Sequence, residues 1–369
     1  MQTIQADVVV VGGGPSGAMA ARELSRGGAD VVLIEKNLSF DKPCGGGLFL
    51  KAFEEFDLPL SLVTKRVESI DIVAPDNTRT SVDIRAYPLG VVHRKVFDHA
   101  LRDQAAASGA RILQARARTV TPDAQGVTVQ ASDPSTQETY TLRATYLIAA
   151  DGVNSSIRKQ HLGAPPSRVL TWYADLPQAT SEACQFWFGD DISPGYYAWI
   201  FPHHQGINVG LVADDRHRMN DFYATFFRRA ELGRPPKPRG YYIPHWREQT
   251  LYRDRILYVG DSASLVLPFT YEGIYYALKS GRLAAQALLD DAPQSYPKNW
   301  NDLYRKKFRF LRILQTIFLR NDWFATRMSR LYRHPKFQRA VLGYWSGSRE
   351  PAGAIVTICK AAKALIFYR

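Results

Sequence analysis

The segment Asp7-Val-Val-Val-Val-Gly-Gly-Gly-Pro-Ser-Gly17 decides the fold of this chain. Its β-branched run is typical of a buried parallel strand, and residues 18–24 that follow the glycines predict a helix. A second strand, residues 30–34, then ends at Glu35. Strand, glycine turn, helix, strand and acid therefore follow one another in the order of a dinucleotide-binding βαβ unit.

Each glycine of this turn has a distinct role in such a unit. Gly12 permits the tight turn, Gly14 lets the backbone approach a pyrophosphate, and Gly17 lets the helix pack closely on the strand. The pyrophosphate is expected at the helix N-terminus and the ribose at Glu35. A glycine-rich turn without a ligand is the alternative interpretation. The nucleotide contacts predicted in this segment are Gly12, Gly14, Ser16, Gly17, Glu35 and Lys36.

The length of 369 residues favours two domains or one large α/β domain with an insert. The net charge of +12 is unevenly distributed. Residues 301–369 hold 15 Lys and Arg and three acidic residues, so the first 300 residues are neutral. Three widely spaced cysteines predict neither a disulfide framework nor a metal site and fit a reducing compartment. Neither a signal peptide nor an apolar run of ~18 residues is present, so we expect a cytoplasmic protein that does not span a membrane.

Three later segments carry a resemblance to a known class of proteins. Arg94-Lys-Val-Phe-Asp98 on a predicted helix, Asp151-Gly152 after an apolar strand, and Gly260-Asp261 after another resemble the motifs of glutathione-reductase-type FAD proteins. The resemblance implies that FAD is the nucleotide and that these residues bind it. Simple helix capping by Asp151 and Asp261, and a surface role for Arg94, are the alternatives. The FAD contacts implied here are Arg94, Asp151, Gly152, Gly260 and Asp261.

Two further segments resemble the geranylgeranyl reductases, members of the p-hydroxybenzoate-hydroxylase-like superfamily. One is Pro43-Cys-Gly-Gly-Gly47, where three glycines imply a close approach to the backbone or a moving loop. The other is Pro194-Gly-Tyr-Tyr-Ala-Trp-Ile-Phe-Pro202, whose alternation places three aromatic side chains on one face of a strand. Spacing alone favours a core position for this face, whereas the resemblance implies the wall of a prenyl cavity. The residues implied are Cys44, Gly45, Gly46 and Gly47 near FAD, and Tyr197, Trp199, Phe201 and Pro202 near the substrate.

Tyr271 departs from the pattern of this family. The family reads Pro-x-x-Gly-Glu-Gly-Ile where this chain has Pro268-Phe-Thr-Tyr-Glu-Gly-Ile274. The tyrosine either stacks beside the flavin, narrows the pocket or forces a different loop. The matching residues Glu272, Gly273 and Ile274 are expected to contact the cofactor.

The expected fold class is α/β (α+β), a Rossmann-like FAD-binding domain with an antiparallel-sheet substrate domain and a C-terminal helical segment. The FAD domain is expected over residues 1–65, 91–160 and 251–292. Residues 67–73 and 80–84 predict a hairpin. The substrate domain is expected over residues 66–90 and 161–250, and the basic helical region over residues 293–369.

The basic end has the composition of helices that lie on a membrane. Helical spacing places Phe308, Leu311, Leu314 and Phe318 on one side of residues 304–320, flanked by arginines, and residues 355–369 are again apolar with scattered bases. We expect peripheral association with an anionic membrane surface. The alternatives are a helical cap on the protein body and a docking site for an acidic redox donor. Nucleic acid is not expected, because no nucleic-acid-binding motif accompanies the charge.

The leading functional hypothesis is an FAD-dependent reductase that saturates isolated C=C bonds of a prenyl (geranylgeranyl-type) lipid. Hydride transfer needs a proton donor as well, and the candidate catalytic residues are Cys44, Tyr197 and Tyr271. The electron donor is NAD(P)H or ferredoxin, and no second glycine motif marks a separate NAD(P)H domain. An FAD-dependent monooxygenase acting on an apolar substrate is the alternative, and a lipid- or protein-binding module with a vestigial flavin site is a third class.

Overall fold

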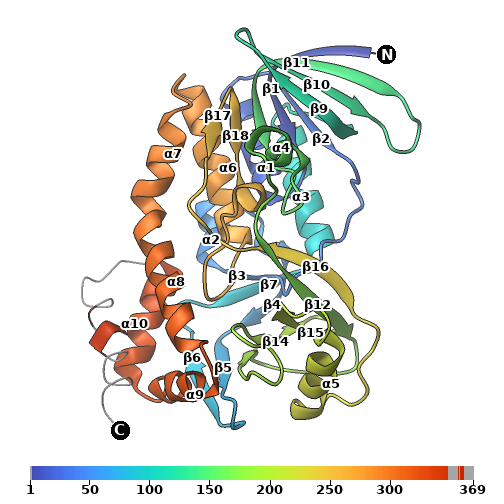
Figure 1. Ribbon diagram of the computed structural model, residues 1–369. Helices are drawn as coiled ribbons and strands as arrows, with labels where there is room; N and C mark the ends of the chain where they lie inside the picture. Colours follow the sequence, from blue (N-terminus) through green and yellow to red (C-terminus); the bar gives the residue numbers. More distant parts are fainter. Residues whose placement is uncertain (1, 348–355, 357, 361–369) are drawn as a thin grey trace. The chain divides into compact units, whose positions relative to one another are not determined.

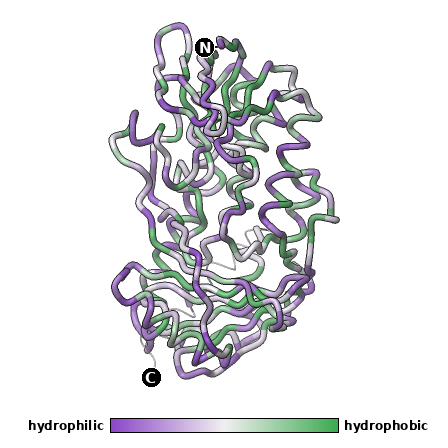
Figure 2. The backbone as a smooth tube through the Cα atoms, turned by 90° about the vertical axis from the view of Figure 1, so that its right-hand side faces the viewer, coloured by the Kyte–Doolittle hydropathy of each residue, from purple (hydrophilic) through white to green (hydrophobic). Residues whose placement is uncertain are grey.

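The computed structural model describes residues 2–347, 356 and 358–360, and the chain folds as two units. The first unit contains residues 1–42, 94–168 and 242–311, and the second contains residues 43–93, 169–241 and 312–369. Each unit has its own sheet system and its own core (Figure 1). Hydrophobic stretches of the chain run through the strands, and hydrophilic stretches lie mostly on peripheral loops and helices (Figure 2).

The sheet of the first unit is built around β1 (Gln2–Val11), whose residues 8–11 are buried. β1 pairs in parallel with β2 and with β11, and the order of the sheet is β17-β18-β11-β1-β2-β8. β9 and β10 extend it as an antiparallel addition on β11. The predicted parallel sheet is confirmed. The other strands are β2 (Val31–Glu35), β8 (Arg111–Gln114), β9 (Arg116–Pro122), β10 (Val127–Ser132), β11 (Thr139–Ala149), β17 (Tyr252–Arg253) and β18 (Ile256–Tyr258).

Helix α1 (Pro15–Arg26) packs against α3 (Arg94–Ala107) and α6 (Ile274–Leu289). The glycine turn follows the carboxyl end of β1, and the Asp-Gly and Gly-Asp motifs follow β11 and β18. Parallel strands therefore bring three motifs that are far apart in the sequence to one sheet edge. The remaining elements are α4 (Ser156–Leu162), η2 (Gly260–Ala263), α7 (Ser295–Trp300), the π-helical turn η3 (Asn301–Arg305) and α8 (Lys306–Phe318), which continues into the second unit.

The second unit contains a seven-stranded sheet in the order β16-β12-β15-β14-β13-β5-β6 and a three-stranded sheet in the order β3-β7-β4. β5 and β6 form the predicted hairpin, and β13 pairs in parallel with β5. The strands are β3 (Gly47–Phe49), β4 (Val63–Val67), β5 (Ser69–Val73), β6 (Arg79–Asp83), β7 (Leu89–Val92), β12 (Arg168–Leu176), β13 (Cys184–Trp187), β14 (Ala198–His203), β15 (Gly206–Ala213) and β16 (Arg239–Pro244).

One face of the large sheet packs on helix α5 (Met219–Arg229). Ala198 and Ile200 of β14 share a buried cluster with Phe222 and Phe226 of this helix. The opposite face of β14 is therefore the one that carries the aromatic row predicted from the sequence. The other helices of the second unit are α2 (Lys51–Glu55), η1 (Leu60–Leu62), α9 (Asp322–Leu331) and α10 (Pro335–Ser346).

The basic helices differ in one respect from the expectation. The predicted apolar side of α8 is not exposed: the protein itself buries Phe308, Leu314 and Phe318 to 0%, 7% and 3% exposure, and Leu311 is partly buried. This apolar face therefore contributes to the core and is not open to lipid. Of the second expected interfacial stretch, residues 355–369, only residues 356 and 358–360 are described. None of the described helices is long and apolar enough to cross a membrane.

Candidate functional site

The glycine turn leaves the N-terminus of α1 open. Gly12 has a φ of +108°, and a Cβ on Gly17 would lie 1.9 Å from the carbonyl oxygen of Gly12, so helix and turn meet backbone to backbone. Gly14, the N-cap, has no side chain to cap the first helical N–H groups, and a Cβ there would meet no heavy atom within 4 Å. Uncapped N–H groups beside open space are the features that a pyrophosphate requires.

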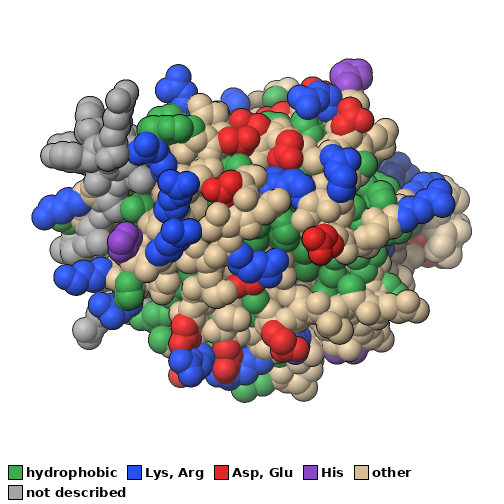
Figure 3. All heavy atoms as spheres, turned by 90° about the horizontal axis from the view of Figure 1, so that it is seen from below, with side chains coloured by type: hydrophobic (Ala, Val, Ile, Leu, Met, Phe, Trp, Pro, Cys, Tyr) green, Lys and Arg blue, Asp and Glu red, His purple; other side chains and the backbone are tan. Residues whose placement is uncertain are grey.

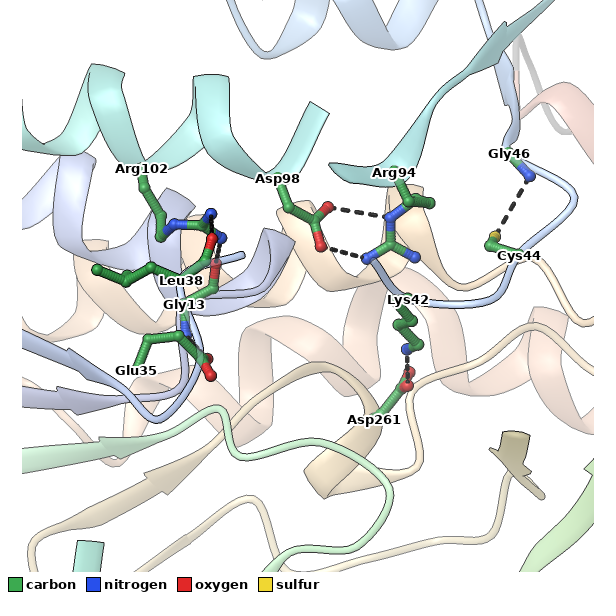
Figure 4. A network of polar contacts seen from close by, with 10 residues as sticks. All are labelled: Gly13, Glu35, Leu38, Lys42, Cys44, Gly46, Arg94, Asp98, Arg102 and Asp261. Carbon is green, nitrogen blue, oxygen red and sulfur yellow. Dashed lines mark hydrogen bonds and ion pairs between the residues drawn. The ribbon is translucent and has the colours of Figure 1, made fainter. Parts of the chain in front are cut away.

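Glu35 is held in place beside this turn. Its Oε2 accepts the N–H of Gly13 at 2.8 Å, and its Oε1 accepts the N–H of Asn37 at 3.0 Å. Lys36 beside it is exposed. Arg102 of α3, which the sequence did not single out, donates to the carbonyl oxygens of Gly13 at 3.1 Å and Leu38 at 2.7 Å (Figure 4). Arg102 thereby links the two loops that flank the expected nucleotide.

Two carboxylates follow neighbouring strands at the same sheet edge. Asp261 in η2 pairs with Lys42, whose Nζ lies 2.6 Å from Asp261 Oδ2. Asp151 is partly buried, and its Oδ2 accepts the N–H of Ile157 at 3.2 Å, whereas its buried Oδ1 has no hydrogen-bond partner among the described residues. Burial raises the pKa of Asp151, opposed by the hydrogen bonds at the start of α4. Ser155 is the N-cap of α4, so capping alone does not account for Asp151.

Arg94 forms an ion pair with a residue of its own helix, α3. Its guanidinium donates two hydrogen bonds to the carboxylate of Asp98, at 2.9 and 2.7 Å, and both side chains are buried (Figure 4). A bidentate pair of this kind fixes the orientation of the guanidinium. The Arg-x-x-x-Asp spacing of the predicted motif is therefore explained by one helical turn.

The loop that carries Tyr271 keeps a conformation suited to glycine. Tyr271 has a φ of 52°, and its N–H donates to the carbonyl oxygen of Leu267 at 3.0 Å. Its hydroxyl lies 3.2 Å from Nδ1 of His245. The backbone at Tyr271 therefore has the left-handed conformation that a glycine at this position would adopt. His245 was missed because 26 residues separate it from Tyr271 and no motif marks it.

The second unit holds the Cys44 loop and the aromatic strand together. A Cβ on Gly45 would lie 2.8 Å from the ring of Phe201, and one on Gly47 would lie 3.2 Å from it. The predicted close approach to the glycines is therefore made by Phe201. The N–H of Gly46 donates to Sγ of Cys44 at 3.3 Å (Figure 4).

The aromatic row is packed tightly at one position. Trp199 is 7% exposed, its Nε1 donates to Oδ1 of Asn208 at 2.8 Å, and Asn208 donates in turn to Asp175. A Cβ on Gly210 would lie 2.3 Å from the Trp199 ring, so this glycine makes room for the indole. The row continues into Phe186 of β13, whose ring contacts Tyr197 and Phe201 edge-on at 5.3 and 5.4 Å between centroids. Pro202, which follows Phe201 and lies by alternation on the opposite face of β14, is also buried.

The predicted site residues therefore form two groups. The nucleotide group and Tyr271 lie in the first unit, and the Cys44 loop with the aromatic strand lies in the second. The nucleotide group fits FAD, because the uncapped helix, the open space at Gly14 and the orphan oxygen of Asp151 all offer contacts to a bound polar ligand.

Comparisons with known proteins agree with this description. The model of a family described as FAD binding domain matches residues 5–47 and 65–238. The chloroplastic geranylgeranyl diphosphate reductase of Nicotiana tabacum is 31% identical over 348 residues, which cover 85% of this chain and 75% of that protein. The digeranylgeranylglycerophospholipid reductase of Methanocaldococcus jannaschii is 29% identical over 299 residues, or 76% of each chain.

Solved structures share the fold. A geranylgeranyl bacteriochlorophyll reductase-like protein from Thermoplasma acidophilum superimposes with a TM-score of 0.82 at 21% identity, covering 97% of this chain and all of that one. The flavin-dependent brominase Bmp2 gives a TM-score of 0.75 at 16% identity, with coverage of 97% and 99%. The expected α/β fold class is confirmed. The chain belongs to the geranylgeranyl reductase family of FAD-dependent oxidoreductases, with FAD as its cofactor.

Proposed function

We propose that this enzyme saturates isolated C=C bonds of a prenyl lipid of the geranylgeranyl type. The observation that carries the proposal is the second unit, where the Cys44 loop lies directly on the aromatic face of β14. Tyr197, Trp199 and Phe201 bring three aromatic side chains to this face, against which we place the polyisoprenoid chain, and Pro202 follows them at the end of the same motif. The names of the two relatives, both reductases of geranylgeranyl compounds, support the same substrate class.

An isolated alkene has no carbonyl group to accept charge, so its reduction needs a hydride and a proton. FAD, when bound and reduced, supplies the hydride. The protein must hold the double bond in line, exclude water and provide the proton. The proposed proton donors are Cys44, Tyr197 and Tyr271, which carry a thiol or a phenol. Trp199 is proposed to line the prenyl site but not to bind a polar group of the substrate, because Asn208 already accepts its indole N–H.

The test is a single turnover without oxygen. Photoreduced protein is mixed with geranylgeranyl diphosphate or a geranylgeranyl lipid, and we expect the flavin to be reoxidised and a product two hydrogens heavier to form. Removing the true donor through Cys44→Ser, Tyr197→Phe or Tyr271→Phe is expected to slow this step by about 100-fold or more. Cys359→Ser, at an exposed cysteine, is the matched control.

A flavin that is never reoxidised by any prenyl substrate would refute the reductase proposal. NAD(P)H-dependent oxygen consumption that the lipid stimulates would instead indicate the monooxygenase alternative. Supplying NADPH, NADH or reduced ferredoxin in turn to the same assay identifies the electron donor, for which we propose NAD(P)H or ferredoxin.

We further propose that helices α8 to α10 hold the protein against an anionic membrane surface. Ile313 and Trp323 are exposed to 58% and 48%, and Arg327 stacks on Trp323 at 4.0 Å. Figure 3 shows Lys and Arg side chains crowded at the left of the face seen from below. From residue 312 to residue 346 the bases are Arg312, Arg320, Arg327, Arg330, Arg333, Lys336 and Arg339, and the acid is Asp322. Exposed aromatic and aliphatic side chains among bases fit an interfacial helix.

Vesicle flotation tests this contact. Wild-type protein is expected to float with anionic vesicles at low salt and to stay behind with neutral ones. Trp323→Ser and Ile313→Ser are each expected to weaken binding by roughly tenfold, because each removes about 1.5 kcal/mol of apolar insertion. Leu60→Ser, at an exposed leucine outside these helices, is the control. Equal flotation of all variants would refute the membrane contact, and binding to an acidic ferredoxin alone would assign the basic surface to a redox partner.

A further inference from the structure

Tyr271 occupies a position that costs free energy. In the loop of residues 267–273, Phe269 and Tyr271 have φ values of 77° and 52°, which residues with a side chain rarely adopt. Each such residue costs about 1 kcal/mol or more relative to glycine. Hydrogen bonds from Leu267 N–H to Glu272 O and from Tyr271 N–H to Leu267 O, both 3.0 Å, hold the loop in this form. Tyr271 therefore occupies a conformation that is unfavourable for a residue with a side chain, directly before the expected cofactor contacts Glu272 and Gly273. We take this as a sign that the tyrosine side chain has a function.

The hydroxyl of Tyr271 is directed at His245. Its oxygen lies 3.2 Å from Nδ1, and the two rings meet edge-on at 6.2 Å. Both side chains are partly buried, and the N–H of His245 donates to the carbonyl oxygen of Ser167 at 2.7 Å. A phenol and an imidazole at this distance can exchange a proton directly.

The segment of residues 245–251, here called the strap, is anchored by the residues that follow His245. The ring of Trp246 packs edge-on against Phe308 of α8 at 5.5 Å. Glu248 forms ion pairs with Arg305 and Arg309, and these hold the pKa of Glu248 down at about 2. The strap therefore stays anchored over the whole pH range in which a histidine titrates.

Gln249 gives the strap a third anchor. It accepts a hydrogen bond from Arg158 of α4, and Arg158 also donates to the carbonyl oxygen of Ser262 at 3.4 Å. Ser262 belongs to η2, the turn that carries Asp261. The position of His245 is thus tied to the turn that bears the expected cofactor contact.

We propose that Tyr271 gives the proton to the substrate and that His245 is the positioning residue that orients and reprotonates it. The inference rests on the proposed reductase function. The O–H bond of Tyr271 breaks as a C–H bond forms on one alkene carbon, while the other carbon takes the hydride that reduced FAD supplies. The proton on Nδ1 of the imidazolium then passes to the phenolate oxygen, and water returns a proton to the imidazole. The alkene gains two hydrogens, and the flavin is the two-electron donor.

The inference predicts a direction for the pH dependence. The strap carries Arg247 and Glu248, and Arg158, Arg305 and Arg309 pair with it. The elements that hold these partners also carry Lys159 and His161 on α4, Asp302 on η3, and Lys306, Lys307 and Arg312 on α8, and Glu272 adjoins Tyr271 in the sequence. The groups with known partners, Arg158, Glu248, Arg305 and Arg309, keep their charge between pH 5 and 8. The reduction step is therefore expected to be fast while His245 is protonated and to slow as rising pH removes its proton.

The first measurement does not depend on turnover. The imidazole of His245 is titrated by NMR in the FAD-loaded protein, and Tyr271→Phe is expected to shift its titration and its ring nitrogen signals. His99→Gln, at an exposed histidine on α3, is the control and is expected to leave both unchanged. Identical titrations of His245 in the wild type and in Tyr271→Phe would overturn the inference, whatever the reductase assay gives.

The second measurement is the pH profile of the single-turnover reaction. Tyr271→Phe is expected to lower the rate about 100-fold, and His245→Gln about tenfold with loss of the basic limb of the profile. A basic limb that persists in His245→Gln, or full activity of Tyr271→Phe, would overturn the inference and leave the reductase function standing. A wild-type protein that reduces no prenyl substrate would refute the proposed function instead. The effect of Tyr271→Phe on the NMR titration of His245 can still be measured in that case, because it does not depend on turnover.

Discussion

Gly14→Ala is expected to weaken FAD binding strongly in a protein that still folds, whereas Gly17→Ala is expected to destabilise the fold itself. A methyl group on Gly14 meets no protein atom within 4 Å and occupies the space in which the pyrophosphate must approach the helix N-terminus. A methyl group on Gly17 would lie 1.9 Å from the Gly12 carbonyl oxygen, and neither backbone can move without displacing α1 from β1. The two substitutions therefore distinguish an effect on FAD binding from an effect on the packing of α1 against β1.

Titration of the apoprotein with FAD and denaturant unfolding of the apoprotein measure the two effects. Gly14→Ala is expected to weaken FAD binding by about 100-fold or more, which is about 2.8 kcal/mol, and to change the free energy of unfolding by less than about 1 kcal/mol. Gly17→Ala is expected to lower that free energy by about 3 kcal/mol or more. Wild-type affinity for FAD in Gly14→Ala would contradict the placement of the pyrophosphate.

Local patterns predicted the parts of the fold in which neighbouring residues decide the structure. The valine run of β1 and the spacing of Gly12, Gly14 and Gly17 predicted the βαβ unit. The apolar runs before Asp151 and Asp261 predicted two strands, which the structure shows to pair in parallel. The alternation at residues 197–201 correctly predicted which side chains of β14 share a face. These features have periods or turns that a short window contains.

The contacts that complete the site were not predictable, because they join residues that are far apart in the sequence. Lys42 pairs with Asp261 across 219 positions, and Arg102 reaches the turn at Gly13 across 89. No pattern in either segment distinguishes these bases from ordinary surface residues. The pairing of His245 with Tyr271 was missed for the same reason.

The amphipathic pattern of α8 shows a different limit of prediction from sequence. Periodicity identified the apolar side that contains Phe308, Leu314 and Phe318, but it does not say what covers that side. The structure shows that protein covers it, since Phe308 contacts Trp246 and Tyr276. A membrane contact of these helices must therefore use the exposed side, which includes Ile313.

Gly210→Ala is expected to have the largest effect in the second unit. Its Cβ would lie 2.3 Å from the ring of Trp199 and 2.6 Å from the backbone oxygen of Trp172, so the methyl group has a rigid neighbour on either side. Trp199 cannot rotate away without losing the hydrogen bond from its Nε1 to Asn208, which would leave a buried donor unsatisfied. The substitution therefore strains the fold and displaces the proposed prenyl wall together.

Denaturant unfolding is expected to show a loss of about 3 kcal/mol or more for Gly210→Ala. Gly240→Ala is the matched control in the same sheet, because its Cβ would meet the Trp172 ring at an ordinary 3.6 Å. That control is expected to change the free energy of unfolding by less than about 1 kcal/mol. Similar stability of the two variants would show that β14 and β15 can separate at Trp199. The indole would then be mobile, and a fixed aromatic wall for the substrate would be ruled out.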